Sequence, residues 1–141
     1  MAANPIRGEV DITLDGQAFV LRPSFEACVA MEQQTGRSLL ELAMAADGSA
    51  LSLDHQAIIV TECVKAWGKA TENTAARGVS KARIGELIHG VGVIAVLPRI
   101  ALVLSAAVTG GVHLDGSPKD DDEGEAMTTG MEPPPAVEPQ A

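Results

Sequence analysis

The residues that most often carry chemistry in proteins are few in this sequence and widely spaced. Two cysteines, Cys28 and Cys63, and three histidines, His55, His89 and His113, match no metal-ligand or nucleophile spacing. Both cysteines lie on apolar helical stripes, where a free cysteine usually behaves as a small hydrophobic residue. A cluster of Cys28, Cys63 and His89, or a cysteine–histidine nucleophile, would require the fold to bring distant residues together. We therefore expect no catalytic residue, no cofactor and no metal site.

Two further stretches could suggest ligand binding, and both have simpler interpretations. Gly90-Val91-Gly92 does not follow a predicted strand, so it lacks the context of a phosphate-binding loop. The acidic run Asp120–Asp122 lacks the ligand spacing and the glycine of a calcium-binding loop. We expect that run to be a solvated part of a flexible tail.

Charge is distributed unevenly along the 141 residues. The formal net charge is −9, with 19 acidic and 10 basic residues. Residues 1–110 carry 11 acidic and 9 basic side chains, whereas residues 111–141 carry eight acidic residues and one lysine. The acidic charge repels phosphate groups, and three aromatic residues are too few for base stacking, so we expect no nucleic-acid partner.

No secretory signal opens the sequence, and we expect a cytoplasmic protein.

The N-terminal region predicts a β-hairpin over residues 8–14 and 17–22. Polar and apolar residues alternate on both sides of Asp15-Gly16, a pair that favours the two-residue turn of a hairpin. Pro23 removes a backbone donor and ends the second strand. The face expected to pack on helices is formed by Val10, Ile12, Leu14, Phe19 and Leu21, with the opposite set as the alternative.

Five helices are predicted from apolar spacing and capping residues. The first helix places Phe25 and Met31 on one apolar arc, and Gly68 is expected to end the third. Residues 69–78 are expected to form a loop, and Pro98 to lie in the first turn of the last helix. The expected helices are residues 25–34 after Ser24, 39–46 after Ser38, a third opening at Ser52 or Asp54 and ending at Trp67, a fourth after Ser80, and 98–108.

The last predicted helix is apolar on nearly every face. Arg99 and Pro98 interrupt the stretch 91–108, so we expect a core or interface helix and no membrane span. One face of this helix is enough to form a core and consists of Leu97, Ile100, Ala101 and Leu104. That leaves Leu102, Val103 and Ala106 as candidate partner-binding residues.

Glu32 is a further candidate for partner contact. It falls within the apolar arc of the first helix. The alternative is a carboxylate at the edge of that arc, paired with Arg22 or Arg37.

The predicted fold is α+β and mainly α. An N-terminal two-stranded β-hairpin packs on a cluster of four to five short helices within residues 1–110. Residues 111–141 form a second region that contains few large apolar side chains. Such a composition cannot offset the entropy of ordering the backbone, so we expect a disordered, acidic, proline-containing tail.

Four stretches near the N-terminus carry a family resemblance: Arg7–Val10, Leu14–Gly16, Leu21–Ala27 and Glu32–Leu42. Their order and spacing resemble a small gene-transfer-agent family of tailed-phage proteins. Its members are assigned as tail assembly chaperones and are sometimes labelled tail tube proteins. The resemblance is good over residues 6–45, agrees only in pattern over the later helices, and does not extend to the tail.

The resemblance implies a non-enzymatic function in the bacterial cell that produces the particle. It implies binding to the tape measure protein, a long apolar helical rod, and assistance to the tail tube protein as it polymerises. Self-association is compatible with that role, and the protein would be absent from the mature particle. The alternatives are a structural tail component of the tube or its cap, an unrelated adaptor, a membrane-associated protein, or an enzyme. Tube subunits need long β-strands to build a continuous ring of sheet, and one hairpin supplies too few strands, which makes the structural role the alternative.

Overall fold

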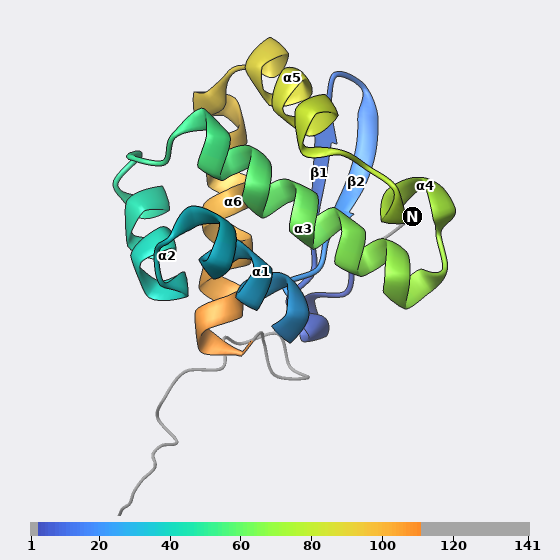
Figure 1. Cartoon of the computed structure of the whole chain (residues 1–141), viewed down its shortest axis with the longest axis horizontal. Coiled ribbons are helices and arrows are strands. Elements are labelled where there is room, and N and C mark those ends of the chain that lie inside the picture. The colour runs from blue at the N-terminus through green and yellow to red at the C-terminus, as the bar shows by residue number, and fades with distance from the viewer. Residues whose placement is uncertain (1–2, 111–141) are drawn as a thin grey trace, which may run out of the picture.

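The fold is α+β and mainly helical, as predicted. A computed structural model describes residues 3–110, and the predicted tail lies outside them. In Figure 1, α3 crosses the middle of the molecule in front of α6 and the hairpin. The elements in chain order are the 3-10 helix η1 (Pro5–Arg7), β1 (Val10–Leu14), β2 (Gln17–Leu21), α1 (Phe25–Thr35), α2 (Leu39–Asp47), α3 (Leu53–Thr71), α4 (Thr74–Arg77), α5 (Lys81–Val91) and α6 (Val93–Thr109).

The predicted hairpin is confirmed, with slightly shorter strands. β1 and β2 pair antiparallel, with Leu14 opposite Gln17 at the turn. Asp15 and Gly16 have φ values of 51° and 77°, the positive values that a two-residue turn of this kind requires. The side chains of Val10, Ile12 and Leu14 are buried, so the predicted face of the first strand is the one that packs on the helices.

The second strand is buried more extensively than the sequence indicated. Leu21 is fully buried and Phe19 is half-buried, as expected for the predicted face. Val20, whose side chain points to the opposite face, is also fully buried. β2 contacts α3, which explains why more than one face of this strand is covered near its C-terminal end.

Serine caps begin four of the helices, as the sequence predicts. Ser38 and Glu41 form a complete capping box at the start of α2. The other three serines each accept a hydrogen bond from the backbone N–H three residues later, at 3.1 Å: Ser24 from Ala27, Ser52 from His55 and Ser80 from Arg83.

The prediction that Gly68 ends the third helix is wrong. α3 continues to Thr71 and ends at Glu72, which has a φ of 57°. A Cβ atom at position 68 would lie 2.8 Å from the carbonyl carbon of Ala76 and against the backbone nitrogen of Arg77. Glycine is therefore needed at position 68 because α4 passes directly over it.

The predicted loop at residues 69–78 contains the short helix α4. Asn73 caps it by accepting a hydrogen bond from the Ala76 N–H at 3.0 Å. Ala76 is buried, and α4 packs on α3. Alanine is small enough to bring the two helices close at the point where Gly68 offers no side chain.

The prediction that the last helix starts near Pro98 is also wrong. α6 begins at Val93 and carries Pro98 inside it, while Gly92, with a φ of 108°, separates α6 from α5. Pro98 lies on the exposed side of the helix. The Ile94 carbonyl, which would accept from an N–H at position 98, can therefore hydrogen-bond water instead.

Nothing within residues 3–110 forms a helix long and apolar enough to cross a membrane.

Candidate functional site

Of the residues that could carry chemistry, Cys28 on α1 and Cys63 on α3 lie close enough for the charge of Cys28 to act on the pKa of Cys63. Within residues 3–110, no group of three or more histidine, cysteine or acidic side chains is arranged to hold a metal ion. His113 and Asp120–Asp122 lie outside the described residues.

The two cysteines are free thiols in poorly solvated surroundings. Burial raises the pKa of Cys63, and it raises the pKa of the half-buried Cys28 as well, with a further contribution from the charge of Glu32. A raised pKa keeps a thiol protonated at neutral pH, and the protonated form is a weak nucleophile. Both residues therefore behave as the apolar side chains that their positions indicate.

The predicted partner-binding residues of α6 differ in exposure. Leu102 is 51% exposed and Ala106 is half-buried, which fits the expectation of an accessible face. Val103 is 1% exposed, so the expectation that it is available to a partner is wrong. The reason is that α6 contacts α2, α3, α5 and β1. Its core face is therefore wider than the stripe of Leu97, Ile100 and Leu104 alone.

Glu32 has a local structural role that the sequence did not indicate. Its Oε2 accepts a hydrogen bond from the Leu39 N–H at 2.8 Å, which ties the end of α1 to the start of α2. Neither of the expected partners, Arg22 or Arg37, forms an ion pair with it in the described part of the chain. The side chain is exposed, and its contact with a partner stays a prediction.

Leu102 and Ala106 lie in a pocket of about 260 Å³ between α6 and the N-terminal segment, which we call the α6 groove. Gly8, with a φ of 76°, passes so close that a Cβ atom there would lie 3.3 Å from the Cβ of Ala106. Arg99 is exposed on the same helix. The groove is lined by Arg99, Leu102 and Ala106 on α6 and by Ala3, Pro5, Gly8, Glu9, Val10 and Asp11 on the N-terminal side.

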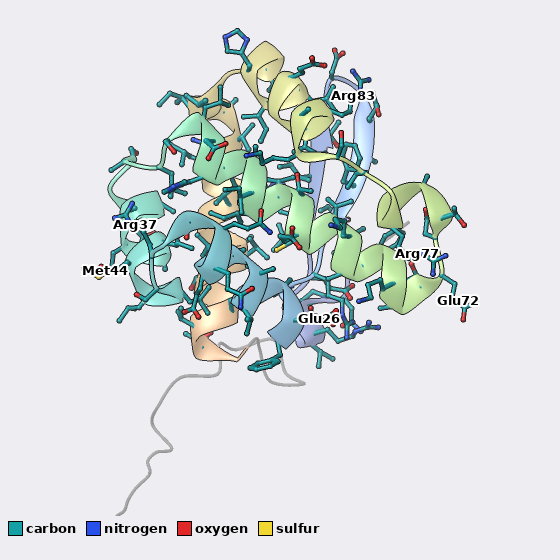
Figure 2. The ribbon with its side chains drawn as sticks, viewed as in Figure 1. Glu26, Arg37, Met44, Glu72, Arg77 and Arg83 are labelled. Carbon is teal, nitrogen blue, oxygen red and sulfur yellow. The ribbon has the colours of Figure 1, made fainter. Side chains whose placement is uncertain are left out.

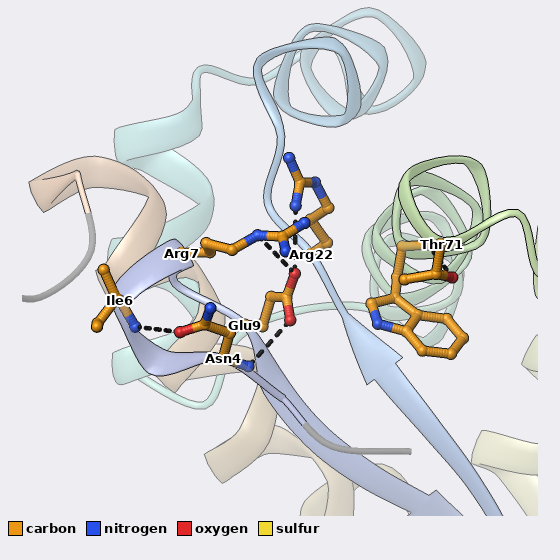
Figure 3. A network of polar contacts seen from close by, with 7 residues as sticks. Asn4, Ile6, Arg7, Glu9, Arg22 and Thr71 are labelled. Carbon is orange, nitrogen blue, oxygen red and sulfur yellow. Dashed lines mark hydrogen bonds and ion pairs between the residues drawn. The ribbon is translucent and has the colours of Figure 1, made fainter.

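A buried carboxylate fixes the N-terminal wall of this groove (Figure 3). The Glu9 side chain is 2% exposed and lies 3.3 Å from Arg7 Nε and 3.2 Å from Arg22 Nη1. Its other oxygen accepts a hydrogen bond from the Asn4 N–H at 2.9 Å. This network was not predicted from the sequence. A signal was present, since both arginines and the glutamate belong to the stretches that carry the family resemblance.

Several large apolar side chains are exposed elsewhere. Phe25 was expected on the apolar arc of α1 but is 86% exposed, because its position at the first residue of α1 points it away from the core. Leu40 and Met44 are 59% and 66% exposed and lie one helical turn apart on α2. Figure 2 shows Met44 projecting outward from α2. Exposed apolar residues in neighbouring positions are typical of protein-binding surfaces.

These features together have the character of a small, mainly helical domain with apolar surface for protein contacts. The model of one protein family, described as phage tail tube protein, GTA-gp10, matches residues 7–110. The chain belongs to this family, and the predicted relationship to gene-transfer-agent and phage tail proteins is confirmed. The matched range contains both strands and all six α-helices of the described chain.

The other two comparisons found nothing similar. No curated protein matches the chain. No solved structure matches it either.

Proposed function

We propose that this chain is a non-enzymatic component of a phage-type tail and works by binding other tail proteins. The observation that carries the proposal is the family match over residues 7–110, which spans the whole hairpin-plus-helix domain. The description of the family as tail tube proteins favours a structural role, as a subunit of the tube or of its cap. A mainly helical domain fits a position on or at the end of the tube better than one within a wall of continuous β-sheet.

A second candidate is an assembly chaperone for the tail, acting in the cytoplasm of the producing cell. A specific observation favours it: within residues 3–110 the sheet consists of two strands of five residues each. Such a sheet offers little backbone for building a continuous tube wall. The exposed Leu40, Met44 and Leu102 instead offer apolar surface to a helical partner such as the tape measure protein.

The two roles predict different contents of the finished particle. Mature particles are purified from producing cells and the chain is quantified by mass spectrometry relative to the major tube protein. A structural component is present at a fixed ratio to the tube. A chaperone is absent from particles and co-purifies from the cell lysate with the tape measure protein or with unassembled tube protein. Absence from both particles and tail-protein complexes would refute the proposed function.

The α6 groove can be tested by a matched pair of substitutions. Leu102→Glu places a charge in the groove, and Ser105→Glu places the same charge at another exposed position of α6. We predict that Leu102→Glu weakens co-purification with tail proteins by about tenfold. We predict little effect of Ser105→Glu, and for both variants a free energy of unfolding within about 0.5 kcal/mol of the original chain. Equal binding by the two variants would show that the groove is not the contact surface.

A further inference from the structure

A pocket of about 300 Å³ is formed where β2, α3, α4 and α5 meet. Its floor is apolar, because Val64 and Ile84 are fully buried there and Trp67 is buried beside them. Arg83 of α5 lines the pocket and is exposed (Figure 2). This arginine forms no ion pair with any other residue that the structure describes. An apolar floor below a cation suits an apolar group that has a carboxylate beside it.

An occupant of this pocket has to bring its own backbone hydrogen bonds. Val20 of β2 is fully buried, and the Arg22 N–H donates to the Cys63 carbonyl of α3 at 3.0 Å. The edge of β2 is therefore covered by α3 and cannot pair with an added strand. A helix satisfies its backbone internally and reaches a pocket through its side chains. The expected occupant is a helix that presents an apolar side chain and a carboxylate about one turn apart.

The exposed face of α2 on this same chain presents those two groups. Met44 is exposed, and Leu40, one turn before it, is exposed as well. Asp47, three residues after Met44, is also exposed. Like Arg83, it forms no ion pair within the described part of the chain. The α2 face thus combines an apolar side chain with an unpaired carboxylate about one turn away.

The charges of Asp47 and Arg83 each lie at the unfavourable end of a helix. Asp47 is the last residue of α2, where the partial negative charge of the helix dipole repels a carboxylate. Arg83 is the third residue of α5, where the partial positive charge repels a guanidinium group. An ion pair between the two side chains would offset both repulsions. The α2 face and the pocket are therefore complementary in charge as well as in polarity.

We propose that α2 of one copy binds the pocket of a second copy, with Met44 in the pocket and Asp47 paired with Arg83. Methionine is flexible and fills irregular apolar spaces well. In Figure 1, α2 lies at the left of the molecule, whereas β2 and α4, which line the pocket, lie at the right. The contact therefore joins different surfaces head to tail and builds an open chain or a closed ring. The inference goes beyond the proposed function, applies to either tail role, and leaves the α6 groove free for other tail proteins.

Sedimentation velocity of the full chain over a range of protein concentrations measures this association. We expect a dissociation constant of about 0.1–1 mM, because one apolar side chain and one exposed ion pair form a small contact. The fluorescence of Trp67, the single tryptophan of the sequence, should change over the same range because Trp67 lines the pocket. Arg83→Gln should weaken the association about threefold.

Two variants that block opposite sides of the contact provide the decisive comparison. Met44→Lys blocks the α2 face, and Ala75→Glu, at an exposed position of the pocket, narrows its entrance and repels Asp47. Each variant alone should associate about tenfold more weakly than the original chain. An equimolar mixture should form a dimer of one copy of each, because one variant keeps its pocket and the other keeps its α2 face. Leu102→Glu, which places a charge in the α6 groove, is the control and should associate like the original chain.

Three results would overturn the inference: a chain that stays monomeric at about 1 mM, equal association of Met44→Lys and the original chain, or a mixture that associates no better than its two components. Weaker association of Leu102→Glu alone would place the contact in the α6 groove and would also overturn it. If Ala75→Glu does not fold, Arg83→Glu takes its place in the mixture. Because no other tail protein takes part in these measurements, their failure leaves the particle assay of the proposed function unaffected.

Discussion

Replacing Gly68 by alanine tests whether α4 is held against α3 as the structure describes. A Cβ atom at this position would lie 2.8 Å from the Ala76 carbonyl carbon and 2.9 Å from the Arg77 Cα. Both neighbours are backbone atoms, so no side-chain rotation can relieve the contact. α4 would have to move away from α3, and the pocket of about 300 Å³ that β2, α3, α4 and α5 line would change shape, because Ala75 and Ala76 form part of its wall.

The expected effect combines two opposing contributions. Alanine in a helix interior is more favourable than glycine by about 1 kcal/mol, whereas overpacking at a tight contact costs about 1–3 kcal/mol. Because the contacting atoms belong to the backbone, the overpacking cost lies near the upper end of that range, and we predict that Gly68→Ala lowers the free energy of unfolding by about 2 kcal/mol. The control is Gly90→Ala in α5, where nothing lies within 4 Å of the added Cβ, and there we predict a gain of up to about 0.5–1 kcal/mol.

Urea unfolding followed by circular dichroism measures both variants, and Trp67 fluorescence reports on the packing beside α4. The two midpoints should move in opposite directions while the slope of each transition stays the same. If Gly68→Ala is as stable as the original chain, or more stable, the close approach of α4 to α3 is refuted.

Two more predictions concern buried groups. Glu9→Gln should lower the free energy of unfolding by about 1.5–3 kcal/mol, because Arg22 loses a charged hydrogen-bond acceptor and Arg7 loses its ion pair. Glu86→Gln on the exposed side of α5 should change the free energy of unfolding by less than about 0.5 kcal/mol, and equal urea midpoints of the two variants would contradict this. Because burial raises the pKa of Cys28 and Cys63, maleimide should label the native chain slowly at neutral pH, and faster labelling should require a pH above the ordinary thiol range. Mass spectrometry with and without urea checks this, and rapid native labelling of Cys63 would show that its thiol is not enclosed.

The fold was predictable where local signals and tertiary packing agree. Asp15-Gly16 specifies the turn of the hairpin through its positive φ values, and Ser24, Ser38, Ser52 and Ser80 mark helix starts by side-chain hydrogen bonds. These signals act within a few residues, so the sequence contains all of the information that they need.

The failures occur where a distant contact determines the local structure. Glycine normally favours a helix end, but Gly68 stays inside α3 because α4 needs the space that a side chain would fill. Pro98 normally favours a helix start, but the packing of α6 on β1 and α2 extends that helix back to Val93.

The surface was harder to predict than the core. Helical periodicity separates an apolar face from a polar one, but it does not tell how many neighbours cover a helix that is apolar all round. Val103 was therefore expected to be open and is enclosed, while Leu102 beside it is exposed. The pocket lined by β2, α3, α4 and α5 was not predicted, because no spacing rule links residues of four separate elements.

The packing of α6 on β1 joins the two ends of the described chain. β1 ends at Leu14 and α6 starts at Val93, and α6 also covers α2. While the ribosome is still making the middle of the protein, the apolar faces of the hairpin and of α2 have no α6 to cover them. The order of synthesis therefore leaves the early part of this chain open to unwanted association until its last described helix emerges.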